Sequence, residues 1–377
     1  MDDRQLCKRR EFISGAAALG AFAALPRAVA VPPEGRPLKF LFMTDHHIES
    51  YFMDGCSPVY SMWRAGNHRA LVETYKFINE DPYCRDADFA LFGGDQIDKG
   101  YTRTKVDMAA QMSNYHRTLD MLDLHAKTKG KTADMCFTAA PWVVRQNLGR
   151  GDSAYEVRPR RPCSRVIAIQ GNHDTGVDEF YRDCAFTAGD TRFVTFFASY
   201  VGLPAPKGQY RSTGKIADAT VEFVEGEMSA AASDPRIRHI VLVCHWSIVL
   251  GDDNFKCPIM DACKENGGSD NRRKLLDIAR KYGCDLFING HEHNGGYPVG
   301  KAGTMGVINC GSVTSSPPRP DAVHGSNGAF AVVEMHPDRA VFNVYSRADV
   351  REDGGTTVVA QRPRRLFVRE IPLKPLR

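Results

Sequence analysis

The sequence lacks several features that would place the chain in other classes of protein. Its 11 cysteines form no Cys-x-x-Cys pair, so a zinc ribbon or a thioredoxin-like site has little support. It contains no glycine fingerprint of a dinucleotide-binding turn and no repeat of solenoid period. Its 49 basic and 45 acidic residues form no long block of one sign, and the net charge of +4 gives little support for tight binding of nucleic acid. These absences disfavour a cofactor-binding redox protein and a repeat protein.

The first 30 residues have the character of an export signal rather than of a fold element. Arg9 and Arg10 precede a modest apolar stretch over residues 15–25, and Ala-Val-Ala at residues 28–30 is a pattern that a signal peptidase accepts. The adjacent arginines resemble a twin-arginine signal, whose pathway exports folded proteins, so the twin-arginine export machinery is an expected partner. The alternative, an amphipathic helix of the mature fold, conflicts with the break at Pro26. No later apolar run is long enough to span a bilayer, so we expect a periplasmic or secreted protein without a membrane span.

Export would place the cysteines in a compartment where disulfides persist. Of the 11 cysteines, only Cys7 would be lost with the signal. Cys257 and Cys263 lie close together in a polar loop and could form a local disulfide, whereas Cys244 and Cys310 lie in apolar runs and are expected to be buried thiols. The sequence does not determine the pairing.

Apolar runs of strand length recur along the chain, and each ends abruptly in polar residues. Their continuous apolar character predicts strands that are covered on both faces. Between them lie segments with apolar residues at helical spacing, so the alternation predicts a layered α/β fold. The strand-like runs are 38–44, 89–92, 166–170, 237–244, 286–289 and 306–309, a hairpin is expected over 329–345, and the helical segments are 70–79, 106–125, 221–232 and 272–282.

Residues with metal-binding side chains follow several of these runs. Asp45-His46-His47 follows the first, and an extended backbone there would point the side chains of Asp45 and His47 to one side and that of His46 to the other. Gly93-Gly94-Asp95 follows the second, where glycines would let the backbone approach an ion or a phosphate closely and a carboxylate could bridge two cations. Asn172 and His173 follow the third run within Gly-Asn-His-Asp.

Histidines follow the two later apolar runs. His245 follows the run over 237–244, and Gly290-His291-Glu292-His293 places two histidines two positions apart after the run over 286–289. In this order, D-x-H, GD-x-x-D, GNHD, a lone histidine and GHxH resemble the motifs of the calcineurin-like metallophosphoesterases, and the resemblance covers about residues 38–315.

The resemblance implies a four-layered α/β/β/α sandwich with its ligands on loops at the carboxyl ends of strands. The domain would span 38–350, with insertions near 51–65, 101–163 and 251–270 and a C-terminal extension over 351–377. Asp45, His47, Asp95 and His293 would hold one metal ion, and Asp95, Asn172, His245 and His291 would hold the other. Nitrogen and oxygen ligands without thiolate suit iron, manganese or zinc.

The implied reaction is hydrolysis of a small phosphate ester, with phosphodiesters slightly preferred over monoesters. Two ions about 3.5–4 Å apart can clamp a phosphate and generate a hydroxide for in-line attack. The resemblance gives His173 the role of general acid and Asp98 that of orienting it, and it places Lys99 where related phosphatases have an arginine that contacts phosphate. The tyrosine of purple acid phosphatases, expected at Asp98, is absent, which disfavours that branch. A phosphomonoesterase, a nuclease and a non-catalytic binder of phosphate ligands stay open as alternatives.

Two other features are interpreted as structural. Gly66-Asn67-His68 repeats part of the GNHD motif but follows no strand, so we expect it to open a helix with Asn67 as the N-cap. The basic stretch over residues 158–162 is expected to be a solvated loop.

Overall fold

A computed structural model of the chain describes residues 35–49, 62–98, 105–130, 136–147, 152–203, 211–249, 270–314, 327–348 and 359–374. The predicted export signal, Lys99, Cys257 and Cys263 lie outside the described residues. Every cysteine that the structure describes is a free thiol, and Cys244 and Cys310 are buried as expected. Among the helices in the described ranges, none combines the length and the apolar character needed to cross a bilayer.

The first of two large sheets carries the N-terminal strands. The central strands are parallel to one another, while the strands from the C-terminal part of the chain join one side in antiparallel fashion. Residues beyond 350 therefore supply an edge strand of the same sheet. In order across the sheet, the strands are β17 (Val359–Pro372), β16 (Arg339–Ala348), β15 (Phe330–Met335), β1 (Leu38–Met43), β2 (Phe89–Phe92) and β6 (Val166–Ala168).

The second sheet has a parallel centre and antiparallel edges. In order, its strands are β13 (Val299–Ala302), β14 (Met305–Asn309), β12 (Leu286–Asn289), β11 (His239–Val243), β8 (Thr191–Thr195), β7 (Cys184–Ala188) and β3 (Phe137–Ala139). Two separate hairpins pair β4 (Trp142–Asn147) with β5 (Asp152–Val157) and β9 (Ser199–Leu203) with β10 (Arg211–Lys215).

Alternate residues of the central strands face different apolar cores, which explains their continuous apolar character. In β1, Phe40 and Phe42 face the core between the sheets, while Leu41 and Met43 face the helices on the outer side. Phe40 of the first sheet meets Phe193 of the second edge to face, with ring centroids 5.3 Å apart. A strand covered on both faces needs apolar residues at every position.

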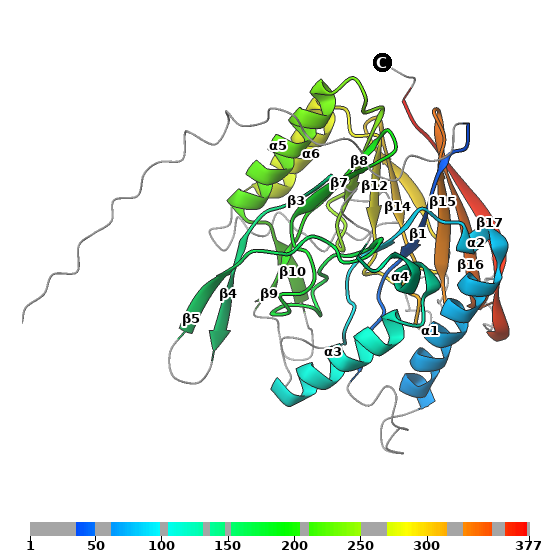
Figure 1. Cartoon of the computed structure of the whole chain (residues 1–377). Coiled ribbons are helices and arrows are strands. Elements are labelled where there is room, and N and C mark those ends of the chain that lie inside the picture. Colours follow the sequence, from blue (N-terminus) through cyan, green and yellow to red (C-terminus); the bar gives the residue numbers. More distant parts are fainter. Residues whose placement is uncertain are drawn as a thin grey trace, which may run out of the picture.

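Helices cover the outer face of each sheet, and Figure 1 shows α5 and α6 together on one side of the molecule and α1 on the other. The first sheet is covered by α1 (Met62–Glu80), α2 (Pro82–Arg85), α3 (Lys105–Leu119) and α4 (Asp123–Thr128), and the second by α5 (Asp218–Ser233) and α6 (Asn271–Lys281). The three apolar cores separate four layers in the order α/β/β/α, so the predicted fold class is confirmed.

Two local predictions were wrong. The single helix expected over 106–125 is divided into α3 and α4, because Asn79 holds the intervening turn by donating to the carbonyl of Met121 and accepting from the N–H of Asp123. Helix α1 begins at Met62, so Asn67 lies inside the helix and is not its N-cap. The partial motif at Gly66-Asn67-His68 is thus an internal part of α1.

Candidate metal centre

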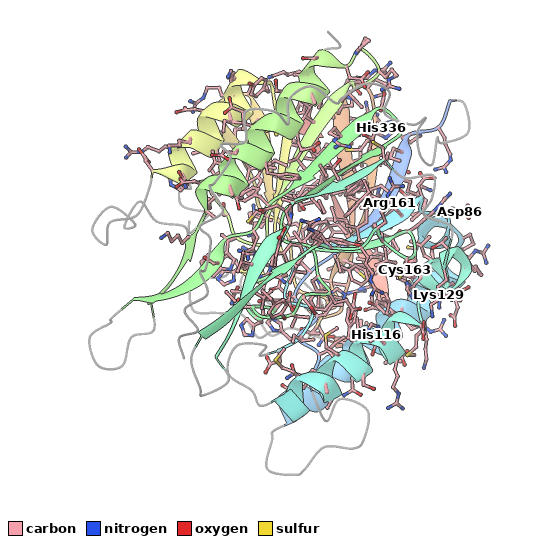
Figure 2. All side chains as sticks on the ribbon, turned by 60° about the vertical axis from the view of Figure 1, so that its left-hand side comes forward. Asp86, His116, Lys129, Arg161, Cys163 and His336 are labelled. Carbon is pink, nitrogen blue, oxygen red and sulfur yellow. The ribbon has the colours of Figure 1, made fainter. Side chains whose placement is uncertain are left out.

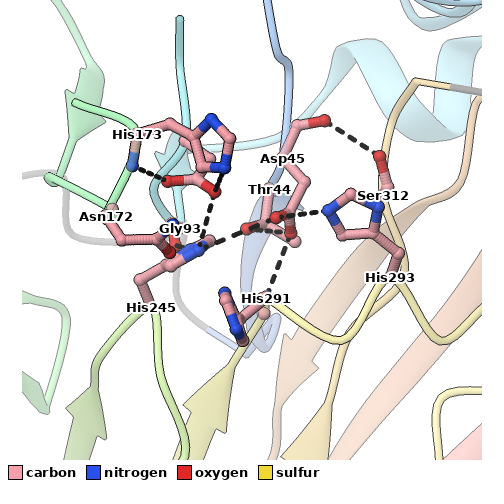
Figure 3. Close-up of polar contacts among 12 residues, drawn as sticks. Thr44, Asp45, Gly93, Asn172, His173, His245, His291, His293 and Ser312 are labelled. Atoms are coloured by element: carbon pink, nitrogen blue, oxygen red, sulfur yellow. Dashed lines mark hydrogen bonds and ion pairs between the residues drawn. The ribbon is translucent and has the colours of Figure 1, made fainter. Parts of the chain in front are cut away.

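The predicted ligands converge at the carboxyl ends of central strands from both sheets (Figure 3). Parallel strands bring such ends to one edge, and here the edges of two packed sheets meet. The first sheet contributes Asp45 and His47 after β1, Asp95 after β2 and Asn172 after β6, and the second contributes His245 after β11 and His291 and His293 after β12.

The backbone of these loops is left-handed rather than extended. Of the six non-glycine residues with positive φ in the described chain, five are predicted ligands: Asp45 (58°), His47 (46°), Asp95 (53°), His291 (71°) and His293 (51°). The extended backbone predicted for Asp45-His46-His47 was therefore wrong, although the two outer side chains still converge. Each such residue costs about 1–3 kcal/mol, and strain of this kind gathers at functional sites.

The first group of ligands joins Asp45 and His47 to His293. Oδ1 of Asp45 lies 2.9 Å from Nε2 of His293 and 3.7 Å from Nε2 of His47. The two Nε2 atoms lie 3.1 Å apart, close enough for one cation to take a lone pair from each. This group contains the ligands predicted for the first ion, apart from the bridging carboxylate.

The second group joins Asp95 to His245 and His291. Oδ2 of Asp95 lies 3.1 Å from Nε2 of His245 and 3.8 Å from Nε2 of His47, so this carboxylate faces both groups. His245 donates from Nδ1 to the carbonyl of Gly93 at 2.9 Å, which leaves the lone pair of Nε2 for the site.

Glycine at position 94 is required both by its left-handed backbone and by the neighbouring His245. Gly94 has φ +104°, and a Cβ there would lie 2.6 Å from Nδ1 of His245. The residue thus admits an imidazole from the second sheet against the backbone of the first.

The donor set fits divalent cations. Oδ1 of Asp45 and Nε2 of His245 are buried, and the nearest polar groups to them in the described chain belong to other predicted ligands. Burial alone would lower the pKa of His245, but the charges of Asp95 and Asp45 outweigh it and raise that pKa to about 10. Burial would likewise raise the pKa of Asp45, but His293 and His245 hold it well below its usual range. Such a cluster of buried carboxylates and imidazoles requires positive charge, which protons or metal ions can supply.

The family follows from comparison with known proteins. The model of the calcineurin-like phosphoesterases matches residues 38–295. The chain belongs to the calcineurin-like phosphoesterase family. As a member, it is a metal-dependent phosphoester hydrolase that uses divalent metal ions and acts on phosphate esters.

Comparison with solved structures found matches of low identity, of which the first shares the fold. A dimetal phosphatase from Danio rerio is 12% identical, with 90% of this chain and 100% of that chain covered and a TM-score of 0.52. PhoD is 9% identical, with 93% and 74% covered and a TM-score of 0.47, and a predicted phosphoesterase from Streptococcus pneumoniae is 10% identical, with 89% and 97% covered and a TM-score of 0.35. No curated protein matches the chain.

In this phosphoesterase, Asp174 ties together the loops after β2 and β6. Its buried carboxylate accepts hydrogen bonds from the N–H groups of Gln96, Ile97 and Gly171 at 2.8–3.1 Å. Burial, and then the charge of Asp95, raise the pKa of Asp174 to about 7. Sequence reasoning recorded this residue only as the last letter of GNHD, because its partners are main-chain groups that no pattern reveals.

Asp45 is held at both its side chain and its main chain. Oδ2 accepts hydrogen bonds from Oγ1 of Thr44 at 2.8 Å and from the N–H of His291 at 3.2 Å. Its carbonyl accepts from Oγ of Ser312 at 2.9 Å and from Oγ1 of Thr314 at 3.0 Å. The small residues after β14 thus serve as clamps that fix the first ligand of the phosphoesterase motifs.

His173 lies beside the bridging carboxylate. Its N–H donates to Oδ1 of Asp95 at 2.8 Å, and its Nε2 lies 3.9 Å from Oδ2 of the same residue. The Nδ1 atom of His173 contacts the main-chain carbonyl of Asp98. The side-chain Oδ1 of Asp98 lies 3.6 Å from Nδ1 of His47. The position is also close enough for His173 to ligate an ion together with His47 and Asp95.

His46 points away from the site into the core beneath α1. It is fully buried, and its ring centroid lies 4.5 Å from that of Phe92 and 6.5 Å from that of Tyr75. Burial lowers the pKa of His46 to about 3, so the ring is neutral. It is a packing residue.

A separate cavity of about 620 Å³ opens between α3, β6 and the base of the β4–β5 hairpin, and it contains none of the predicted ligands. The basic stretch over residues 158–162 lines it. Figure 2 places Arg161 and Cys163 on this side of the molecule, and both residues are exposed. The three arginines of the stretch are solvent-exposed, as expected, whereas Pro162 is buried, and the stretch is separate from the metal centre.

Proposed function

We propose that the chain hydrolyses small phosphate esters with two metal ions and prefers phosphodiesters slightly over monoesters. The observation that supports two ions is the sharing of Asp95 between two ligand groups, because its Oδ2 faces His245 on one side and His47 on the other. In this proposal Asp45, His47, Asp95 and His293 hold one ion. Asp95, Asn172, His245 and His291 hold the other.

The bound ions would polarise the phosphoryl oxygens and lower the pKa of a coordinated water. The protein's own contribution to proton transfer would come from His173. A main-chain carbonyl accepts a hydrogen bond from Nδ1–H whether the ring is neutral or charged, so the contact with Asp98 leaves Nε2 to gain or lose the proton. Nε2 faces the bridging carboxylate and hence the place where the phosphate would lie.

A panel of substrates tests the proposal. Metal-free protein is reconstituted with iron, manganese or zinc and assayed on aryl and alkyl diesters, the matching monoesters, and nucleotides. We expect two ions per chain and turnover that depends on them, with diesters cleaved somewhat faster than the matching monoesters. Faster cleavage of monoesters would overturn the diester preference, and binding of phosphate ligands without turnover would indicate a non-catalytic binder.

We further propose export of the folded, metal-loaded protein to the periplasm or beyond. The support is the adjacent Arg9 and Arg10 in the sequence. Replacing both by lysine should leave the activity in the cytoplasm and remove it from the periplasmic fraction. Unchanged periplasmic activity would instead indicate the general secretory route.

A further inference from the structure

Trp246 touches two of the residues assigned to the second ion. Its indole N–H donates a hydrogen bond to Oδ1 of Asn172 at 2.5 Å, and its ring centroid lies 5.0 Å from that of His291 at an interplanar angle of 45°. The side chain is 1% exposed. Trp246 follows His245 directly, so the segment after β11 brings both a ligand and this indole to the site.

The hydrogen bond fixes which atom of the Asn172 amide faces the indole. An indole N–H can only donate, and of the two ends of an amide only the oxygen can accept. The amide therefore cannot turn over to present its NH₂ group without losing this bond. The oxygen has a second lone pair, which is the one that a cation would use, since an NH₂ group cannot ligate a metal ion.

Gly214 of β10 makes room for the indole. A Cβ at this position would lie 2.3 Å from Cε3 of Trp246 and 3.0 Å from the Cβ of Ala198. Because the Ala198 contact closes the other side, any side chain at position 214 has to displace the indole. The β9–β10 hairpin thus packs directly on the group that orients Asn172.

We propose that Trp246 is a positioning residue, which holds the oxygen of Asn172 toward the second ion and thereby sets the affinity of that ion. The inference rests on the proposed two-ion function. It concerns one ion only, because the two ligands that the indole contacts, Asn172 and His291, both belong to the second ligand set.

The test is metal titration of Trp246→Phe by calorimetry, with metal content measured after dialysis. The phenyl ring keeps much of the packing and removes the donor. We expect the second ion to bind about 10–100-fold more weakly while the first is unaffected. Trp142→Phe is the matched control, because Trp142 is also buried but lies in β4 of the separate β4–β5 hairpin. If Trp246→Phe does not fold, Gly214→Ala makes the same test by displacing the indole.

Repeating the substitution of Trp246 in an Asn172→Asp variant separates the orientation of the side chain at position 172 from the packing of the indole. In Asn172→Asp both terminal atoms are oxygens, so no group is needed to select between them, and adding Trp246→Phe should change the affinity of the second ion by less than about 3-fold. Equal losses in the wild-type and Asn172→Asp backgrounds would overturn the inference, as would normal binding of both ions by Trp246→Phe. A wild-type protein that binds a single ion would overturn the two-ion function itself and this inference with it.

Discussion

The two sheets contribute different chemistry to one site. The first sheet supplies every oxygen ligand and only one imidazole, whereas the second supplies imidazoles alone. The members are Asp45, His47, Asp95 and Asn172 on the first sheet and His245, His291 and His293 on the second. Both carboxylates therefore come from one side of the interface between the sheets, and the other side supplies only imidazoles.

Each sheet also orients the ligands of its partner. Gly93 on the first sheet accepts the hydrogen bond that fixes the tautomer of His245, and Ser312 on the second sheet holds the main chain of Asp45. Neither sheet holds a complete set for either ion. The metal centre therefore depends on how the two sheets pack. Substitutions on the first sheet and on the second should have different effects on metal binding, turnover and stability.

The largest effect is expected from Asp95→Asn on the first sheet. Asp95 faces both ligand groups, so its loss should empty at least one metal site and abolish hydrolysis. Metal analysis and turnover on an aryl diester measure the two results. Asp86→Asn is the control, because Asp86 is exposed at the C-terminal end of α2 (Figure 2). Two ions per chain with near-normal turnover in Asp95→Asn would contradict the bridging role.

His173→Asn tests whether the first sheet also supplies the proton. Both ions should be retained, while the rate on an alkyl ester should fall about 10²–10⁴-fold and far more than on a nitrophenyl ester, whose leaving group needs no acid. Asp98→Asn should give a milder form of the same defect, because the main-chain carbonyl that contacts Nδ1 of His173 is still present. Equal losses on both esters would exclude the acid role, and loss of an ion would make His173 a ligand.

The pH dependence of metal binding should reflect one histidine from each sheet, His47 from the first and His245 from the second. Burial would lower both pKa values, but the contacts of His47 with Asp45 and Asp95 raise its pKa to about 9, and the charges of Asp95 and Asp45 raise that of His245 to about 10. Both pKa values lie above the unfolded value of about 6.5, so protonation stabilises the metal-free fold fully below about pH 6.5. That stabilisation is lost as the pH rises through about 9 to 10.

Metal ions need neutral imidazoles and so must displace these protons. At about pH 7.5, binding should release about two protons per chain, and metal affinity should rise as the pH is raised toward 9. Calorimetry in buffers with different ionisation enthalpies measures the release. Binding without proton release would show that the two imidazoles are already neutral in the metal-free protein.

The smallest effect is expected from Ser312→Ala on the second sheet. It removes one of two hydrogen bonds to the carbonyl of Asp45, and Thr314 still supplies the other. The free energy of unfolding should fall by about 1 kcal/mol, measured by urea denaturation, with both ions retained. Ser233→Ala, which removes an exposed hydroxyl bonded to its own helix, should change it by less than about 0.5 kcal/mol. Equal changes in the free energy of unfolding for Ser312→Ala and Ser233→Ala would contradict the role of Ser312 in holding Asp45.

The sequence by itself determined the fold class and pointed to the residues of the site. Strands such as β1 are apolar at every position because both faces are covered, and this pattern can be read without a structure. The candidate ligands were found for a related reason, since polar residues that interrupt such runs lie at strand ends. The polar residues Asp45, His245 and His291 each follow an apolar run.

Only the tertiary structure decided how these residues are held. The carbonyl of Gly93 contacts His245 and the indole of Trp246 contacts Asn172, although these segments are far apart in the chain, and Asp45 adopts a left-handed backbone beside them. No spacing rule encodes them, because they depend on how closely two sheets pack. Asp174 and Gly94 looked like parts of short motifs, yet the first binds main-chain N–H groups and the second admits a histidine from the opposite sheet. Sequence patterns report which groups are available, and packing of one sheet on the other fixes where their lone pairs point.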